Sequence, residues 1–284
     1  MSKSVFHNLY SQLALDICRG PWLLHNAEAH LPLVQAFFSR VAPVVERQSF
    51  TPLAIDASGE YIDSEEGKPS TPKEYVAVIP IVGTITKYDS CATIGATTLA
   101  EALHHAAIDS EVVGVVLDID SGGGSCSAIP IMREAITAVL NAGKPIITHA
   151  DLCASAAYWI ASMTDAIFAD NDFSEFGSIG VMAQMYRPAD NVITIYAEES
   201  PDKNHEYRAA LDGDFTPTQQ ALSPIVAAFH RDVMAGRPAL RKETPGLLTG
   251  AMFPAARAIE AGLANAMATL DDCVQNVFIR ASNF

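Results

Sequence analysis

The sequence predicts an α/β protein whose parallel sheets are flanked by helices. After Lys73, short runs of apolar and β-branched residues alternate with stretches whose apolar residues recur at helical spacing. The runs are apolar along nearly their whole length, which is typical of strands buried on both faces of a parallel sheet. Hydrophobic residues make up 49% and charged residues 18% of the 284-residue chain, so it can bury a core and is not disordered throughout.

The elements follow from these runs in chain order. Strands are expected over 75–82, 112–119, 145–149, 166–169 and 192–196. Helices are expected over 98–107, 128–140, 156–163, 217–234, 254–262 and 271–280.

Residues 1–50 are predicted to form an N-terminal helical arm, because apolar residues in two stretches recur at helical intervals around Gly20-Pro21. Residues 51–73 are rich in Pro, Ser, Gly and Glu, a composition that is typical of a linker. The remaining 74–284 are expected to be the main domain. An arm of this size is expected to dock on the main body or on a neighbouring subunit.

The formal net charge of −15 makes the chain a poor ligand for nucleic acid, whose affinity for proteins comes largely from Lys and Arg. No apolar run is long enough to span a membrane and no signal-peptide pattern opens the sequence, so we expect a cytoplasmic origin. The five cysteines are scattered without a C-x-x-C pair, which favours reduced thiols and neither a disulfide framework nor a zinc site. No metal or other cofactor is expected.

Glycine-bearing turns follow several predicted strands, where open α/β sheets place their sites. The segment 118–124, Asp-Ile-Asp-Ser-Gly-Gly-Gly, has neither the Gly-Lys-Ser/Thr ending of a Walker A loop nor the spacing of a dinucleotide-binding turn. Its glycines either bring backbone N–H groups close to a ligand or serve a tight strand-to-helix turn. A second turn, 175–181, contains Gly177, Ser178 and Gly180.

Ser155 lies between alanines at the start of a predicted helix, after the strand 145–149. Free backbone N–H groups and the positive end of the helix dipole at such a position suit a nucleophile whose product is an oxyanion. The alternative is a serine that merely caps the helix. Ser178 is a weaker candidate nucleophile, because no helix is predicted to start behind it.

A serine nucleophile needs a base. Lys203 and Lys242 are the lysines that follow Ser155, and Lys203 comes after the predicted strand 192–196, from which it can return to the site. His149 and His205 are alternative bases. A Ser-His-Asp arrangement of His205 with Asp118, Asp120 or Asp202 is also compatible with the sequence.

Four ordered segments resemble the signal peptide peptidase A family of serine peptidases, which includes proteases that tailed phages use in capsid assembly. They are Val78–Thr86 (VIPIVGTIT), Val115–Gly124 (VVLDIDSGGG), Ala154–Ala161 (ASAAYWIA) and Gly177–Val181 (GSIGV). The resemblance covers about Tyr75 to Leu270. The family usually has proline where this chain has Gly122.

The resemblance implies a Clp-protease-like or crotonase-like α/β core and a Ser-Lys dyad. The family serine falls on Ser155. The family lysine lies roughly fifty residues further on, which matches Lys203. An alignment on Tyr207-Arg-Ala-Ala instead places Arg208 there, and because arginine cannot act as a base near neutral pH, that alignment implies a non-catalytic relative.

Under the same resemblance, Gly123, Gly124 and Ala156 supply oxyanion-hole N–H groups. Gly122, Ser178 and Gly180 are expected to contact a polypeptide substrate. Family members assemble into rings, so a homo-oligomer is expected.

A phage prohead protease that cleaves scaffold and capsid proteins inside the head in the host cytoplasm is the preferred branch. A soluble bacterial housekeeping protease and a non-catalytic capsid-assembly relative are the alternatives. An acyl-CoA enzyme of the crotonase type is disfavoured because few basic residues are available for the anionic CoA.

Overall fold

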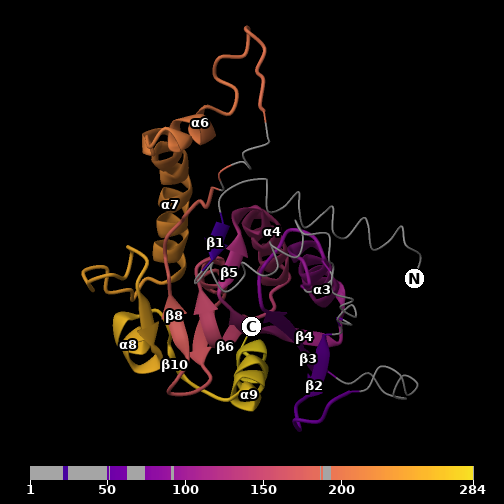
Figure 1. Ribbon diagram of the computed structural model, residues 1–284. Helices are drawn as coiled ribbons and strands as arrows, with labels where there is room; N and C mark the ends of the chain where they lie inside the picture. The colour runs from indigo at the N-terminus through magenta and orange to yellow at the C-terminus, as the bar shows by residue number, and fades with distance from the viewer. Residues whose placement is uncertain are drawn as a thin grey trace.

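The computed structural model describes residues 50, 52–62, 74–90, 93–185, 187 and 193–283, together with the backbone of 22–24. Its centre is a mainly parallel sheet with strand order β10-β7-β6-β4-β3-β2, and β8 pairs with both β6 and β9 (Figure 1). Only the β2–β3 and β8–β9 pairs in this sheet are antiparallel. The strands are β2 (Leu53–Asp56), β3 (Tyr75–Val82), β4 (Val112–Ser121), β6 (Ile146–Ala154), β7 (Ala166–Ala169), β8 (Glu175–Gly177), β9 (Met252–Pro254) and β10 (Ala266–Met267).

Two short strands, β1 (Trp22–Leu24) and β5 (Gly123–Ser125), form a separate antiparallel pair beside the main sheet (Figure 1). A 3-10 turn, Cys126–Ala128, links β5 to the following helix. The helices are α3 (Ala96–Ile108), α4 (Ile129–Asn141), α5 (Ala156–Ala161), α6 (His205–Leu211), α7 (Thr216–Gly236), α8 (Ala255–Ala261) and α9 (Leu270–Ala281).

Helices cover both faces of the sheet, as the nearly continuous apolar strands require. Along β4, Val115, Leu117 and Ile119 pack into the larger core, which includes the buried faces of α3 and α4. Val116 points to the opposite face and packs with α9. A Cβ at Gly114 would lie 2.5 Å from Cγ1 of Val277, so glycine at this position lets α9 approach the sheet closely.

Helices α6 and α7 extend beyond this layered core. The carboxyl-terminal part of α7 is anchored by the stacked rings of Trp159 and Phe229, whose centroids lie 4.5 Å apart, and by a hydrogen bond from Trp159 Nε1 to Asp232 (2.9 Å). By contrast, α6 has no buried residue. Figure 1 shows α6 and the segment before it standing away from the sheet. This projecting part therefore lacks a core of its own within the chain.

The α/β prediction, with parallel strands flanked by helices, is confirmed. The strand expected over 192–196 is wrong, because residues 193–197 have no regular structure and no partner strand in the described part of the chain. Residues 53–56 of the predicted linker form β2 on the sheet edge. Residues 22–24 of the predicted helical arm form β1, whereas the rest of its two predicted helical stretches lies outside the described residues.

Candidate active site

Ser155 lies at the strained turn between β6 and α5. Its backbone has φ 56° and ψ −119°, a conformation that L-residues rarely adopt and that is found mostly at functional sites. It occupies the position before the first helical residue, yet its side chain makes no capping hydrogen bond. The structure therefore does not support the alternative that Ser155 is an ordinary helix cap.

The loop that contains Gly122–Gly124, here called the glycine loop, lies next to this turn, because Ser121 of β4 is paired with Cys153 of β6. One edge of β5 is held by Ile85, whose N–H donates to the Gly123 carbonyl (2.9 Å) and whose carbonyl accepts from the Ser125 N–H (2.8 Å). A Cβ on Gly124 would lie 1.9 Å from the Ile85 carbonyl oxygen, so this close backbone approach requires glycine.

The N–H groups of the loop differ in their surroundings. The Gly123 N–H donates to Ser121 Oγ (3.1 Å) and is thus engaged inside the loop. Since successive residues of a strand direct their backbone groups to opposite edges, Gly124 directs its N–H and carbonyl away from Ile85. Ala156 is the first residue of α5, and its N–H has no acceptor within the helix.

The turn 177–180 borders the same site. Ala154 and Gly177 are register partners of β6 and β8, and the Ser155 N–H donates to the Gly177 carbonyl (2.9 Å). Ser178 also has a positive φ of 50°, but its N–H donates to the Ala251 carbonyl and no helix follows it. The structure thus brings Gly122–Gly124, Ser155 and the 177–180 turn together at the carboxyl end of the sheet.

Lys203 is not part of this group within the chain. It is exposed, in a turn just before α6, and none of the side-chain hydrogen bonds found in the described residues joins it to Ser155. Arg208 on α6 holds this turn, because its guanidinium donates to the Pro201 carbonyl and lies 4.9 Å over the Tyr196 ring. Arg208 therefore stabilises the conformation of the segment that carries Lys203.

The histidine alternatives lie elsewhere. His149 Nδ1 lies 2.7 Å from Asp118 Oδ1 and its Nε2 lies 3.1 Å from Asp170 Oδ1. Burial alone would lower the pKa of His149, but the two carboxylates outweigh burial and raise it above its usual value. Six residues of extended chain, roughly 20 Å, separate His149 from Ser155, so His149 is not the base of this serine in the chain. His205 is exposed at the start of α6.

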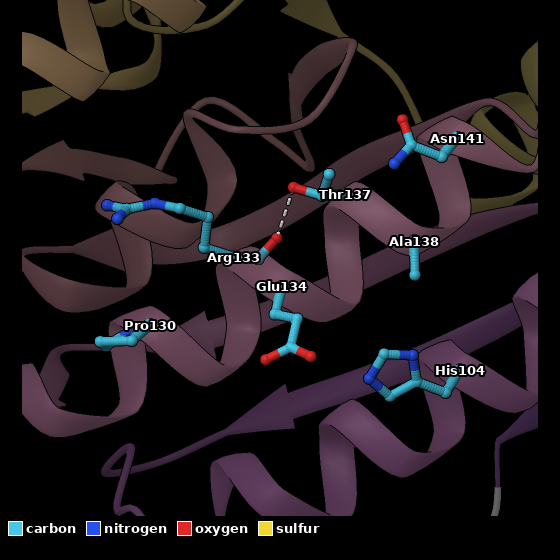
Figure 2. A pocket seen from close by; sticks show the side chains of 7 residues that line it. All are labelled: His104, Pro130, Arg133, Glu134, Thr137, Ala138 and Asn141. Atoms are coloured by element: carbon cyan, nitrogen blue, oxygen red, sulfur yellow. Dashed lines mark hydrogen bonds between the residues drawn. The ribbon is translucent and has the colours of Figure 1, made fainter.

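An apolar recess of about 310 Å³ adjoins the site, with Cys126 just after β5, Trp159 one helical turn after Ser155, and Ile225 on α7 among its lining residues. Sequence reasoning missed this recess, because its walls come from four separate elements, the 3-10 turn that begins at Cys126 and the helices α4, α5 and α7. A second cavity, of about 440 Å³, lies between α3 and α4 and is lined by His104, Arg133 and Glu134 among others (Figure 2). All of its lining residues lie on α3 and α4, and none belongs to the turn, loop or helix around Ser155. We therefore assign this cavity no part in the chemistry.

The described residues contain no cluster of three side chains suited to binding a metal ion. None of the helices in the described part of the chain is both long and apolar enough to cross a bilayer.

An α/β sheet with a strained serine between strand and helix, flanked by a glycine loop and by free helix N–H groups, is the arrangement of a serine hydrolase. The model of peptidase family S49 matches residues 138–281, just over half of the sequence and including Ser155. The chain belongs to peptidase family S49.

Curated relatives include "Protease 4" of Haemophilus influenzae, 28% identical over 209 residues that cover 70% of this chain and 34% of that protein. "Protease 4" of Salmonella typhi is 31% identical over 123 residues, 43% of this chain and 20% of that protein. The matched part of the chain therefore spans about a third of the first relative and a fifth of the second.

Similar solved structures include a membrane-bound stomatin-specific protease, with 17% identity, a TM-score of 0.39 and coverage of 70% of this chain and 82% of that one. Another is an enoyl-CoA hydratase from Shewanella pealeana, with 12% identity, a TM-score of 0.40 and coverage of 73% and 69%.

Proposed function

We propose that the chain is a serine endopeptidase whose nucleophile is the Ser155 hydroxyl. The observation that carries this proposal is the conformation of Ser155, a strained residue at a strand-to-helix turn whose hydroxyl is not used as a cap. Strain of this kind costs on the order of 1–3 kcal/mol, persists only where the surrounding structure enforces it, and is concentrated at active sites and ligand-binding sites. Membership of peptidase family S49 supports the same chemistry.

In the proposed reaction, Ser155 Oγ attacks the carbonyl carbon of a peptide bond while a base removes its proton. The N–H groups of Gly124 and Ala156 donate to the developing oxyanion. The tetrahedral intermediate collapses as the base returns the proton to the leaving amine, which leaves an acyl group on Ser155. Water, activated by the same base, then releases the acyl group.

The base that we propose is Lys203 of a second copy of the chain. A lysine acts as a base only where burial lowers its pKa, and Lys203 is exposed in the single chain, so the proposal requires an assembly that buries it. The projecting segment supports such an assembly. Ile193 and Ile195 on it are 86% and 87% exposed, and Phe215 beside α6 is also exposed.

Mixing of inactive variants tests both parts of the scheme. Ser155→Ala and Lys203→Ala should each lower the rate of cleavage of an unfolded protein substrate by about 10²-fold or more, whereas the exposed Lys242→Ala should keep the parental rate. If the base comes from a neighbouring copy, an equal mixture of the two inactive chains should regain about a quarter of the parental rate after co-refolding, since random assembly pairs an intact serine with an intact lysine at about one site in four.

The possible results separate the claims. Cleavage by Ser155→Ala at the parental rate would reject the nucleophile. Loss of activity in Lys203→Ala without recovery in the mixture would place the lysine within the same chain. Full activity of Lys203→Ala would reject this base altogether. Labelling of Ser155 by a fluorophosphonate probe provides an independent measure of its reactivity.

The substrate class that we propose is scaffold and capsid protein of an assembling phage head, within the host cytoplasm. Its support is the resemblance of the four motif segments to a family that includes phage capsid-assembly proteases. Bacterial members share these segments, so the following experiment separates the two substrate classes. Co-expression with a phage scaffold protein should yield Ser155-dependent fragments. A chain that degrades unrelated unfolded proteins equally well and leaves assembled scaffold intact would instead be a housekeeping protease.

A further inference from the structure

Strand β1 covers the edge of the glycine loop that the proposed chemistry needs. Trp22, Leu23 and Leu24 pair antiparallel with Ser125, Gly124 and Gly123, respectively. Figure 1 shows β1 lying beside β5, although the two strands are nearly one hundred residues apart in sequence. The chain therefore places one of its own segments on the loop next to Ser155.

The other edge of β5 cannot accept a substrate, because Ile85 already occupies it with two backbone hydrogen bonds. Gly124 directs its N–H and carbonyl to the β1 edge, and Leu23 is directly opposite. In an antiparallel ladder, opposite residues of this kind exchange both of their backbone hydrogen bonds. The Leu23 carbonyl thus takes the place in which a substrate carbonyl would accept from the Gly124 N–H.

We propose that residues 22–24 act as an intramolecular competitor of the substrate, which binds as an antiparallel strand on β5 only after β1 has left. The inference rests on the proposed function of the same site. Adding a strand to an exposed edge is a general mode of peptide recognition, and the backbone supplies most of its affinity. A three-residue strand is short enough to exchange with a longer substrate that makes more contacts.

The tether sets the size of the effect. A covalently linked strand competes at an effective concentration that does not fall on dilution. If β1 is bound in about nine molecules of ten, the apparent affinity for an external peptide is lowered about tenfold, because only the open fraction is competent to bind. The competition should appear in KM and not in kcat, since saturating substrate displaces β1.

The first test is Leu23→Pro in the full chain. Proline has no N–H and cannot complete the ladder opposite Gly124. Leu23→Ala, which keeps the N–H, separates loss of backbone pairing from loss of the side chain. The binding probe is a fluorescein-labelled peptide with the sequence of residues 19–26, followed by anisotropy. We expect Leu23→Pro to bind it about tenfold more tightly than the parent, with a matching fall in KM for a cleaved peptide.

The second test locks the strand in place. Trp22 and Ser125 are register partners, so Trp22→Cys with Ser125→Cys, in a Cys126→Ser background, should form a disulfide under mild oxidation. The oxidised chain should bind no labelled peptide and cleave no protein, and reduction should restore it to the level of the reduced double variant. This measurement also covers the case in which Leu23→Pro fails to fold.

Equal peptide affinity of the parent and a folded Leu23→Pro, or unaltered binding by the oxidised cysteine pair, would overturn the inference. If the peptide binding changes as expected but no variant cleaves protein or reacts with a fluorophosphonate at Ser155, strand exchange stands and the proposed peptidase activity falls. If Ser155 is active but insensitive to both changes, the peptidase stands and self-occupancy by β1 falls.

Discussion

Replacing Ser155 with glycine should stabilise the protein relative to replacing it with alanine. Both substitutions remove the hydroxyl, but alanine keeps a Cβ at φ 56°, whereas glycine adopts this conformation freely. Relief of backbone strain is worth about 1–3 kcal/mol. The greater freedom of glycine in the unfolded chain offsets about 0.5–1 kcal/mol of that gain. The expected net advantage of Ser155→Gly over Ser155→Ala is therefore about 1 kcal/mol.

Ser162 provides a matched control at the other end of the same helix. It is buried, its hydroxyl donates to the Trp159 carbonyl, and its φ of −63° suits any residue. Here Ser162→Gly should be less stable than Ser162→Ala by about 0.5–1 kcal/mol, because glycine is disfavoured at a helical backbone position. The sign of the glycine-minus-alanine difference should thus reverse between the two serines.

The assay is equilibrium unfolding in urea, with the change in free energy taken from midpoints at an unchanged slope. Thermal melts provide a second measure, in which about 1 kcal/mol corresponds to a shift of roughly 2–4 °C for a domain of this class. If Ser155→Gly is no more stable than Ser155→Ala while Ser162 behaves as expected, Ser155 is not strained. The structural basis for its assignment as nucleophile would then be lost.

Three further predictions follow from the site and its surroundings. Gly124→Ala should displace the loop from Ile85 and destabilise the fold by about 1–3 kcal/mol, which urea unfolding measures; a neutral result would contradict the close approach. The raised pKa of His149 means that its charged form stabilises the fold fully below about pH 6.5, and that this contribution is lost as pH rises through the folded-state pKa. His149→Gln should abolish this pH dependence in unfolding curves, and a parallel pH dependence in the parent and the variant would refute it. Arg208→Ala should loosen the turn that carries Lys203 and so lower kcat by about tenfold or less. Lys203→Ala should lower kcat by about 10²–10⁴-fold. An equal loss of kcat in both variants would contradict the view that Arg208 only positions the lysine.

The central α/β layer could be predicted because its signals are local. The run 112–119 is apolar along its length, and the structure buries Val115 and Val116 on opposite faces of β4. The segment 192–196, for which the sequence also predicts a strand, is just as rich in β-branched residues, yet 193–197 form no strand. A high β-propensity is not enough to form a strand, because the backbone N–H and C=O groups of the segment also need a neighbouring strand with which to pair.

The site was predictable in part for the same reason. Ser155 and the 177–180 turn follow strands whose carboxyl ends must meet at one edge of the sheet, so their proximity follows from topology. The pairing of β1 with β5 joins segments about a hundred residues apart and leaves no local signal in sequence. The bond from the Gly123 N–H to Ser121 Oγ, which distinguishes Gly123 from Gly124, depends on loop geometry that composition does not encode.

The position of Lys203 connects the proposed activity to assembly. A base on an exposed turn is inactive until another surface removes it from water, and the exposed Ile193 and Ile195 on the same segment favour burial against a partner. The net charge of −15 opposes the approach of two copies, and salt screens that repulsion. Catalysis would then need two separable events, association to bring in the lysine and departure of β1 to free the Gly124 N–H. Only association depends on chain concentration and ionic strength, because β1 is tethered to its own site. Dilution should therefore reduce the rate per chain in the parent and in Leu23→Pro alike, even though the two differ in KM.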